Sequence, residues 1–347
     1  YYRRNAFIAN LVEGDEVPLT YRTSGKGYSS EDNSAMAAGT YVTTVTSVLN
    51  ENYTLENGIG LSVEWSILPK EISLENIYWR RDGTEIFEVE YSAKPYSVTA
   101  YAYDGAVDAS DGLVYEGDSV SFTYFGEVIE QFGLSSISEA TAVNAGRYAI
   151  NVIGTNNSDY TVKGTPSVIL TVSQRSIDRT FAKTGSGIYD AKTHGYDFTF
   201  GKILNTAYIE NIIEFVTESE GITVGNRSAL SEERFSVSVT AKNAGIYSFG
   251  VGLNSSVPES ANYSLEYATY EFIVEKKDIS FALQKQSYEY AAKSLTADEV
   301  KIVFDGVVSG ESLIFGNDYD VAFTDGIVSF TPADVGTYNV NVTLKAD

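Results

Sequence analysis

The chain alternates apolar and polar residues in short runs along most of its length. Residues 168–172, 235–239 and 338–342 each place an apolar side chain at every second position. A period of two predicts β-strands with one buried face. Asp-Gly pairs at 82–83 and 104–105 lie between such runs and predict tight turns. The fold class predicted is therefore all-β.

Helix is predicted in only two short segments. Residues 231–234 and 294–300 have the composition for a turn or two of helix, and Ser294 is the expected N-cap of the second. Neither segment changes the all-β prediction.

A Gly-x-Tyr motif recurs four times along the chain. Its tyrosines, which are spaced by 107, 99 and 91 residues, are Tyr41, Tyr148, Tyr247 and Tyr338. Other motifs keep the same order around it. A Tyr-x-Ala-Lys element starts at positions 91, 189 and 290, and a second tyrosine preceded by Asn or Asp follows at 53, 160 and 263. Several motifs in one order at a period near 100 indicate tandem repeats.

The repeats predict four domains, at residues 1–71, 72–176, 177–277 and 278–347. We expect the first to be incomplete at its N-terminal end, the third to be the most divergent, and the last to be a candidate for incompleteness at its C-terminal end. The junctions are short and polar, which favours a semi-rigid string of domains. Four sandwiches end to end would form an elongated rod of roughly 130–150 Å.

The motif tyrosines have the setting of a tyrosine corner, in which the hydroxyl bonds back to a carbonyl a few residues upstream at the start of strand F of an immunoglobulin-type sandwich. The glycine two residues before each tyrosine would allow the tight backbone that the corner needs, including one with a positive φ; these are Gly39, Gly146, Gly245 and Gly336. The ordered motifs resemble the tandem immunoglobulin-like repeats of large bacterial surface proteins and adhesins, in particular the MBG type. That resemblance implies tandem immunoglobulin-like β-sandwich domains, an extracellular stalk or adhesive module at the cell surface, and no catalysis.

Composition narrows the possible chemistry. The 347 residues carry a net charge of −23, with no cysteine and one histidine. Nucleic acid and anionic membranes are unfavourable partners for such a charge. Without cysteine there is no disulfide framework, thiolate nucleophile or zinc cluster. His194 lies beside a predicted turn and is expected to be an exposed loop residue rather than a metal ligand or base.

The sequence contains two candidate sites, and each has a functional and a purely structural explanation. Asp104, Asp108 and Asp111 cluster in one loop and are candidate calcium ligands, because Ca²⁺ prefers carboxylate oxygens, although ordinary solvated turns explain them too. The lysines of the Tyr-x-Ala-Lys elements would permit intramolecular isopeptide bonds. Stems packed along tyrosine rings with the amines in water are the favoured explanation, because no carboxylate recurs in step with the lysines.

The sequence favours a non-catalytic extracellular stalk or adhesion module of a bacterial cell-surface protein. Its expected partners are a host or neighbouring-cell surface protein or glycan, or other copies of itself, with no nucleic acid and no membrane insertion. One alternative is a filament or sheath subunit assembled by strand complementation. Another is a carbohydrate-binding accessory region of a secreted enzyme, with an exposed stripe formed by Tyr101, Tyr103, Tyr115 and Tyr124.

Overall fold

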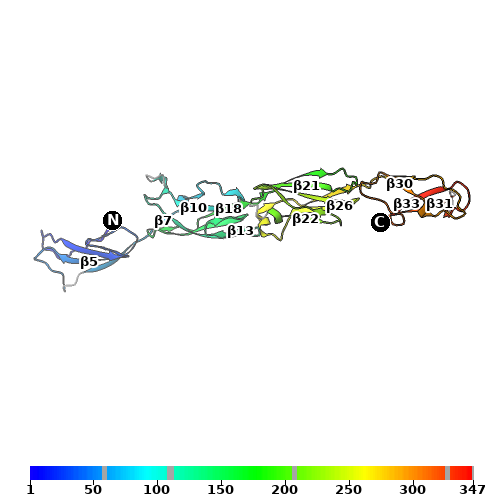
Figure 1. Cartoon of the computed structure of the whole chain (residues 1–347). Helices are drawn as coiled ribbons and strands as arrows, with labels where there is room; N and C mark the ends of the chain where they lie inside the picture. The colour runs from blue at the N-terminus through cyan, green and yellow to red at the C-terminus, as the bar shows by residue number, and fades with distance from the viewer. Residues whose placement is uncertain (57–60, 108–112, 205–208, 325–328, 346–347) are drawn as a thin grey trace. The chain divides into compact units, whose positions relative to one another are not determined.

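The computed structural model describes residues 1–347 except 57–60, 108–112, 205–208, 325–328 and 346–347 (Figure 1). Strands dominate the described residues, so the all-β prediction is confirmed. The helical segments described there are α1 (Ile209–Ile212) and the 3-10 turns Leu74–Asn76, Pro258–Asn262 and Ala297–Glu299. None of the described helices has the length and apolar character needed to cross a membrane.

The chain forms two compact units. Unit 1 comprises Tyr1–Arg175 and Pro258–Ser264, and unit 2 comprises Ser176–Val257 and Leu265–Asp347. Pro258–Ser264, which contains β27 (Tyr263–Ser264), therefore packs with residues far away in the sequence.

Unit 1 begins with a four-stranded antiparallel sheet. The strands of this sheet are β2 (Leu19–Gly25), β3 (Tyr28–Ser30), β5 (Gly39–Val48) and β6 (Ser62–Ile67). Two short strands, β1 (Tyr2–Arg3) and β4 (Ser34–Ala35), form a separate pair. The sheet has the order β3-β2-β5-β6, and β1 pairs with β4. Tyr41 and Trp65 stand opposite each other on β5 and β6 and pack with rings 5.4 Å apart.

The rest of unit 1 is built from two four-stranded sheets. Its strands are β7 (Lys70–Ile72), β8 (Ile77–Arg81), β9 (Glu88–Glu90), β10 (Tyr96–Ala102), β11 (Ala106–Val107), β12 (Leu113–Val114), β13 (Phe122–Gln131), β14 (Ile137–Ser138), β15 (Thr141–Ala142), β16 (Gly146–Thr155), β17 (Tyr160–Val162) and β18 (Ser167–Ser173). The short strand β19 (Arg175–Ser176) begins at the last residue of this stretch. The sheet orders are β14-β15-β10-β8 and β13-β16-β18-β9. When the strands are lettered A to G along the chain, the first sheet has the spatial order D-E-B-A and the second has the order C-F-G. β9 lies beside strand G and corresponds to strand A′. This is the immunoglobulin strand order.

Unit 2 repeats that order. Its first strands are β20 (Asp178–Thr184), β21 (His194–Gly201), β22 (Ile213–Thr217), β23 (Thr223–Val224), β24 (Ser228–Ser231), β25 (Arg234–Ala241), β26 (Gly245–Leu253) and β28 (Ala268–Val274). One sheet is β20-β21-β25-β23, with β24 also on β25, and the other is β22-β26-β28. These are again A-B-E-D and C-F-G, so the fold is an immunoglobulin-like β-sandwich in both places.

The last strands of unit 2 form a smaller arrangement. They are β29 (Ser280–Leu283), β30 (Ile302–Asp305), β31 (Tyr319–Thr324), β32 (Ser329–Phe330) and β33 (Asn339–Leu344). β29 pairs with β30, and the other three form a sheet in the order β32-β31-β33. Val300, Tyr319, Val321 and Phe323 form the buried core beneath them.

Both predicted helices are corrected by the structure. Residues 231–234 form the turn of a β-hairpin, because Ser231 pairs with Arg234 where β24 meets β25. The alternating run that follows, residues 235–239, favours strand and draws these residues into the hairpin. In the second segment helix is limited to Ala297–Glu299, and Thr296 is the cap in place of Ser294.

Acidification is expected to weaken the cap at Thr296. Glu299 accepts hydrogen bonds from the Thr296 backbone N–H and hydroxyl and pairs with Lys293. Lys293, then the Thr296 bonds, lower the pKa of Glu299 to about 2. Since the pKa is depressed in the folded state, the stabilisation is present above the unfolded value of about 4.3 and is lost as the pH falls toward 2. An NMR titration of Glu299 checks this, and a midpoint near 4.3 would contradict it.

Candidate functional site

The four motif tyrosines fold back onto the loops that precede them. Each hydroxyl donates to the carbonyl oxygen four residues upstream: Tyr41 to Ala37 at 2.8 Å, Tyr148 to Asn144 at 2.6 Å, Tyr247 to Asn243 at 2.8 Å, and Tyr338 to Asp334 at 2.7 Å. The tyrosines lie on or just before β5, β16, β26 and β33, which are the F strands of their sheets. We propose these four as tyrosine corners.

The glycine of the motif is needed for space. A Cβ on Gly146 would lie 2.8 Å from the Tyr148 hydroxyl, and one on Gly245 would lie 3.2 Å from the Tyr247 hydroxyl. Neither glycine has a positive φ. The ring lies directly against the glycine, so ring contact rather than left-handed backbone explains the residue.

Two of the corners in unit 1 receive the same additional hydrogen bond, which we call the corner contact. The backbone N–H of Ala38 donates to Asp159 Oδ1 at 2.6 Å, and the backbone N–H of Ala145 donates to Asn262 Oδ1 at 2.8 Å. Both donors lie three residues before a corner tyrosine, and both acceptors immediately precede a second tyrosine. Motifs about 120 residues apart in the chain are thus joined in the same way twice.

The contact at Ala145 is fully buried. Ala145 and Asn262 are 0% and 1% exposed, and Asn262 Nδ2 also donates to Asn144 Oδ1 at 3.1 Å. Gln174 Nε2 donates to the Ala261 carbonyl at 2.9 Å. With both its oxygen and its nitrogen bonded, the Asn262 amide has a fixed orientation.

Close packing surrounds the same contact. The rings of Tyr91 and Tyr263 meet edge to face at 5.5 Å. Gly133 has a φ of +50°, and a Cβ there would lie 2.5 Å from the Ala261 Cβ. A larger residue at 133 would therefore push Pro258–Ser264 away from the corner.

The contact at Ala38 is charged and partly open. Lys26 Nζ donates to the Ala38 carbonyl at 2.6 Å and to Ser158 Oγ at 2.7 Å, beside the Asp159 carboxylate. Burial, and to a lesser extent the negative charge of Asp159, raise the pKa of Tyr41. The Tyr41 hydroxyl therefore stays protonated and keeps its bond to Ala37 at any physiological pH.

The sequence contained the signal for the corner contact, because both motifs recur in step. Sequence order alone does not indicate that the residue before the second tyrosine reaches back to the preceding corner.

The candidate calcium ligands are placed only in part. Asp108 and Asp111 lie outside the described residues. Asp104 accepts hydrogen bonds from the backbone N–H groups of Glu116 and Ala106, and these, the Glu116 bond first, lower its pKa. Within the described ranges no group of three or more metal-binding side chains occurs. The calcium site stays a prediction.

His194 is buried, so its assignment to an exposed loop was wrong. It is 2% exposed at the start of β21, with Nε2 2.9 Å from Asp190 Oδ1. Its Nδ1 accepts a hydrogen bond from the Gly187 N–H at 3.3 Å, which places the ring proton on Nε2. Gly185, at a φ of +78°, lets the turn close over the ring. His194 therefore stabilises the turn that precedes β21 through hydrogen bonds at both of its ring nitrogens.

The expected tyrosine stripe is incomplete. Tyr115 is buried in the core, and Tyr124 points inward, where its hydroxyl accepts from the Ala100 N–H. Tyr101 and Tyr103 are half-exposed, and Tyr103 lies 6.2 Å from Tyr78. Only these outer tyrosines remain candidates for stacking on a sugar.

No family model matches the sequence, and no curated protein matches it. Among solved structures, the S-layer protein SbsC domains 4 and 5 are 11% identical, with 57% of this chain and 97% of that chain covered and a TM-score of 0.27. Invasin, a bacterial integrin-binding protein, is 10% identical over 98% and 71%, with a TM-score of 0.28. InvD of Yersinia pseudotuberculosis is 12% identical over 78% and 84%, with a TM-score of 0.26. TM-scores this low do not establish a common fold. The strand order described above defines the immunoglobulin topology.

Proposed function

We propose that the chain is a non-catalytic, extracellular stalk or adhesion module of a bacterial cell-surface protein, built from four immunoglobulin-like domains of the MBG type. The supporting observation is the corner contact, in which a motif of one repeat holds the tyrosine corner of the preceding repeat. This bond occurs twice in unit 1, where it holds each corner loop against a segment about 120 residues further along the chain, and such long-range bonds stiffen a spacer. The net charge of −23 keeps parallel copies apart.

Small-angle X-ray scattering tests the spacer proposal. Four sandwiches in line should give a largest dimension of roughly 130–150 Å. A compact particle of half that length would contradict the proposal. Antibody labelling of intact cells of the source organism tests surface display, and labelling that requires permeabilised cells would exclude it.

The proposed partner is a surface protein or glycan of a host or neighbouring cell. A glycan would stack on Tyr101 or Tyr103, so alanine at either position should abolish binding on a glycan array. Binding that survives both substitutions would exclude this face.

Removing the acceptor of the corner contact should destabilise unit 1. Asn262→Ala leaves the buried Ala145 N–H without its bond, at a cost of about 1–3 kcal/mol in the free energy of unfolding. Urea denaturation followed by tryptophan fluorescence measures this, because Trp65 and Trp79 both lie in unit 1.

Two further variants separate the contact from general surface effects. Asp159→Asn keeps an oxygen for the Ala38 N–H and should cost less than Asp159→Ala. Asn156 is exposed, and Asn156→Ala should change stability by less than about 0.5 kcal/mol. If Asn156→Ala and Asn262→Ala lowered the free energy of unfolding equally, the corner contact would not stabilise unit 1 and the proposal would lose its supporting observation.

A further inference from the structure

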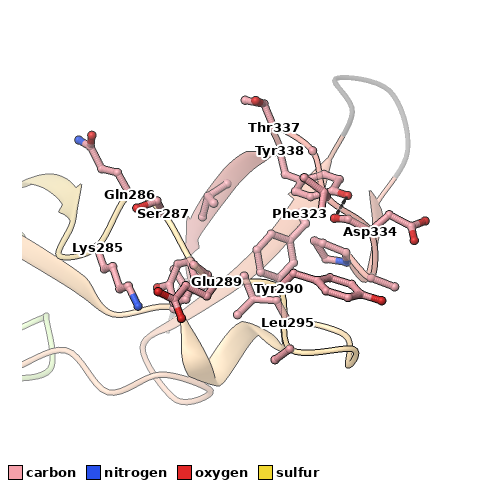
Figure 2. A pocket seen from close by; sticks show the side chains of 18 of the residues that line it. Lys285, Gln286, Ser287, Glu289, Tyr290, Leu295, Phe323, Asp334, Thr337 and Tyr338 are labelled. Carbon is pink, nitrogen blue, oxygen red and sulfur yellow. Dashed lines mark hydrogen bonds between the residues drawn. The ribbon is translucent and has the colours of Figure 1, made fainter.

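A cavity of about 410 Å³ in unit 2 is lined by aromatic and charged side chains together. Figure 2 shows Tyr290 and Phe323 at this cavity, with Lys285 and Glu289 beside them. The amine of Lys285 and the carboxylate of Glu289 have opposite charges, so the cavity favours neither an anion nor a cation. Its charges do not select a ligand, in contrast to those of an aromatic surface in unit 1.

The surface in unit 1 is the outer side of β8 and β10, which we call the tyrosine face. The two strands pair antiparallel, with Tyr101 directly opposite Tyr78. Ala100 and Ala102 of β10 are buried, and because side chains alternate along a strand, the residues between and beside them point away from the core. The members of the tyrosine face are Tyr78, Arg80, Thr99, Tyr101 and Tyr103.

The three tyrosines of this face form one aromatic surface. The ring centroids of Tyr78 and Tyr103 are 6.2 Å apart, and Tyr101 faces Tyr78 across the strands. All three side chains are partly exposed, so their neighbours hold the rings in place while part of each ring remains in contact with solvent. Such rings offer an apolar surface for the C–H groups of a pyranose sugar.

Arg80 adds an unpaired positive charge to the same surface. Its guanidinium carbon lies 5.3 Å from the centroid of the Tyr78 ring. Across the ranges that the structure describes, this guanidinium has no ion pair and no hydrogen bond, although the chain contains 47 acidic residues. Arg179, which lies over the Tyr270 ring, differs because it donates to the Glu266 carbonyl at 3.0 Å. The forked N–H groups of Arg80 are therefore available for the carboxylate of a ligand.

We propose that the tyrosine face binds a terminal uronic acid of a glycan, with the sugar ring on Tyr101 and its carboxylate on Arg80. This inference rests on the proposed glycan partner and names its chemical class. A sugar stacked on Tyr101 lies in the same layer as the guanidinium, which covers the neighbouring Tyr78 ring. In glucuronic acid the carboxylate is equatorial, so it extends within that layer toward the arginine. Arginine binds a carboxylate through two parallel hydrogen bonds.

The net charge of the chain restricts the ligand to a single acidic sugar. At −23, the chain repels a polyanion over its whole length. At physiological ionic strength this repulsion decays over about 8 Å, so a lone carboxylate in contact with Arg80 is influenced mainly by the guanidinium. A glycan that ends in one uronic acid meets both conditions, whereas a polyuronate does not.

Two matched sugars test this inference on the full chain. Methyl β-glucuronide and methyl β-glucoside differ only in the carboxylate that replaces the CH₂OH group. In an NMR titration the glucuronide should bind about five- to tenfold more tightly, the range of a charged hydrogen bond reduced by exposure to solvent. Tyr101→Ala should weaken binding of both sugars. Equal affinities that Tyr101→Ala lowers would leave the glycan partner in place and overturn the acidic sugar. No binding of either sugar would overturn both at this face.

A matched pair of arginine variants locates the carboxylate. Arg80→Gln removes the charge and should lower the affinity for the glucuronide to that for the glucoside, which should not change. The control is Arg147→Gln on β16, which removes the same charge from an exposed position in the other sheet of this sandwich and should affect neither sugar. Equal losses for the two variants would show attraction by net charge alone and overturn the assigned site. If acetate at the same concentration displaced the glucuronide equally well, the ligand would be any carboxylate, such as that of an acidic peptide, and the sugar assignment would fail.

Discussion

Replacing Phe198 by alanine is expected to lower the free energy of unfolding of unit 2 by about 3–5 kcal/mol. Phe198 is 0% exposed and lies at the centre of the aromatic core of β21, β26 and β28. Its ring meets Tyr270 at 4.9 Å and Phe249 at 5.9 Å, both edge to face. The substitution removes buried apolar area and these ring contacts together, and surrounding rings cannot fill the cavity without leaving their own positions.

The measurement can separate the two units within one chain. Both tryptophans, Trp65 and Trp79, lie in unit 1, so urea denaturation followed by near-ultraviolet circular dichroism of tyrosine reports unit 2 as well, whereas tryptophan fluorescence reports unit 1. The matched control is Phe281→Ala in β29, where the ring is 48% exposed and the loss should be much smaller. Similar losses for the two variants would contradict the assigned core.

Tyr148→Ala is the second large effect and should destabilise the sandwich of unit 1 by about 3–5 kcal/mol. Tyr148 is 0% exposed, and its hydroxyl bonds to the Asn144 carbonyl. Tyr148→Phe keeps the ring and removes the hydroxyl with its bond to Asn144 and its longer contact with the Ala145 carbonyl at 3.4 Å, so it should cost about 0.5–1.5 kcal/mol. The difference between the variants separates ring packing from the corner hydrogen bond.

Trp79 fluorescence during urea denaturation measures both Tyr148 variants, because Trp79 lies on β8 of the same sandwich. Tyr101→Phe is the control: this half-exposed tyrosine lies on β10 of the same sandwich and should change stability by less than about 0.5 kcal/mol. A Tyr148→Phe variant as stable as the control would show that the corner bond contributes nothing.

The sequence predicted the parts of the fold that depend on local pattern. Alternation located β18, β25 and β33, and the Gly-x-Tyr motif located the start of each F strand. These features were predictable because a strand face and a tight ring contact each need particular residue types at short spacing.

Features that depend on distant contacts were not predictable. His194 was misplaced because its burial comes from a turn whose glycines, Gly185 and Gly187, close over the ring. Likewise, the bond from Ala145 to Asn262 joins positions 117 residues apart. The repeated motifs marked both partners, but only the folded chain brings them together.

The parallel pairing of β9 with β18 affects how the sandwich of unit 1 resists a pulling force. These two strands lie near the N-terminal and C-terminal ends of that sandwich, and Glu88–Glu90 runs alongside the last residues of β18 in the same direction. Pulling the chain from its two ends would slide the strands past each other along their length. Their hydrogen bonds would then bear the load together in shear, whereas a hairpin opened from its end breaks one bond at a time. Resistance to stretching would thus reside in a short parallel patch rather than in the much larger hydrophobic core.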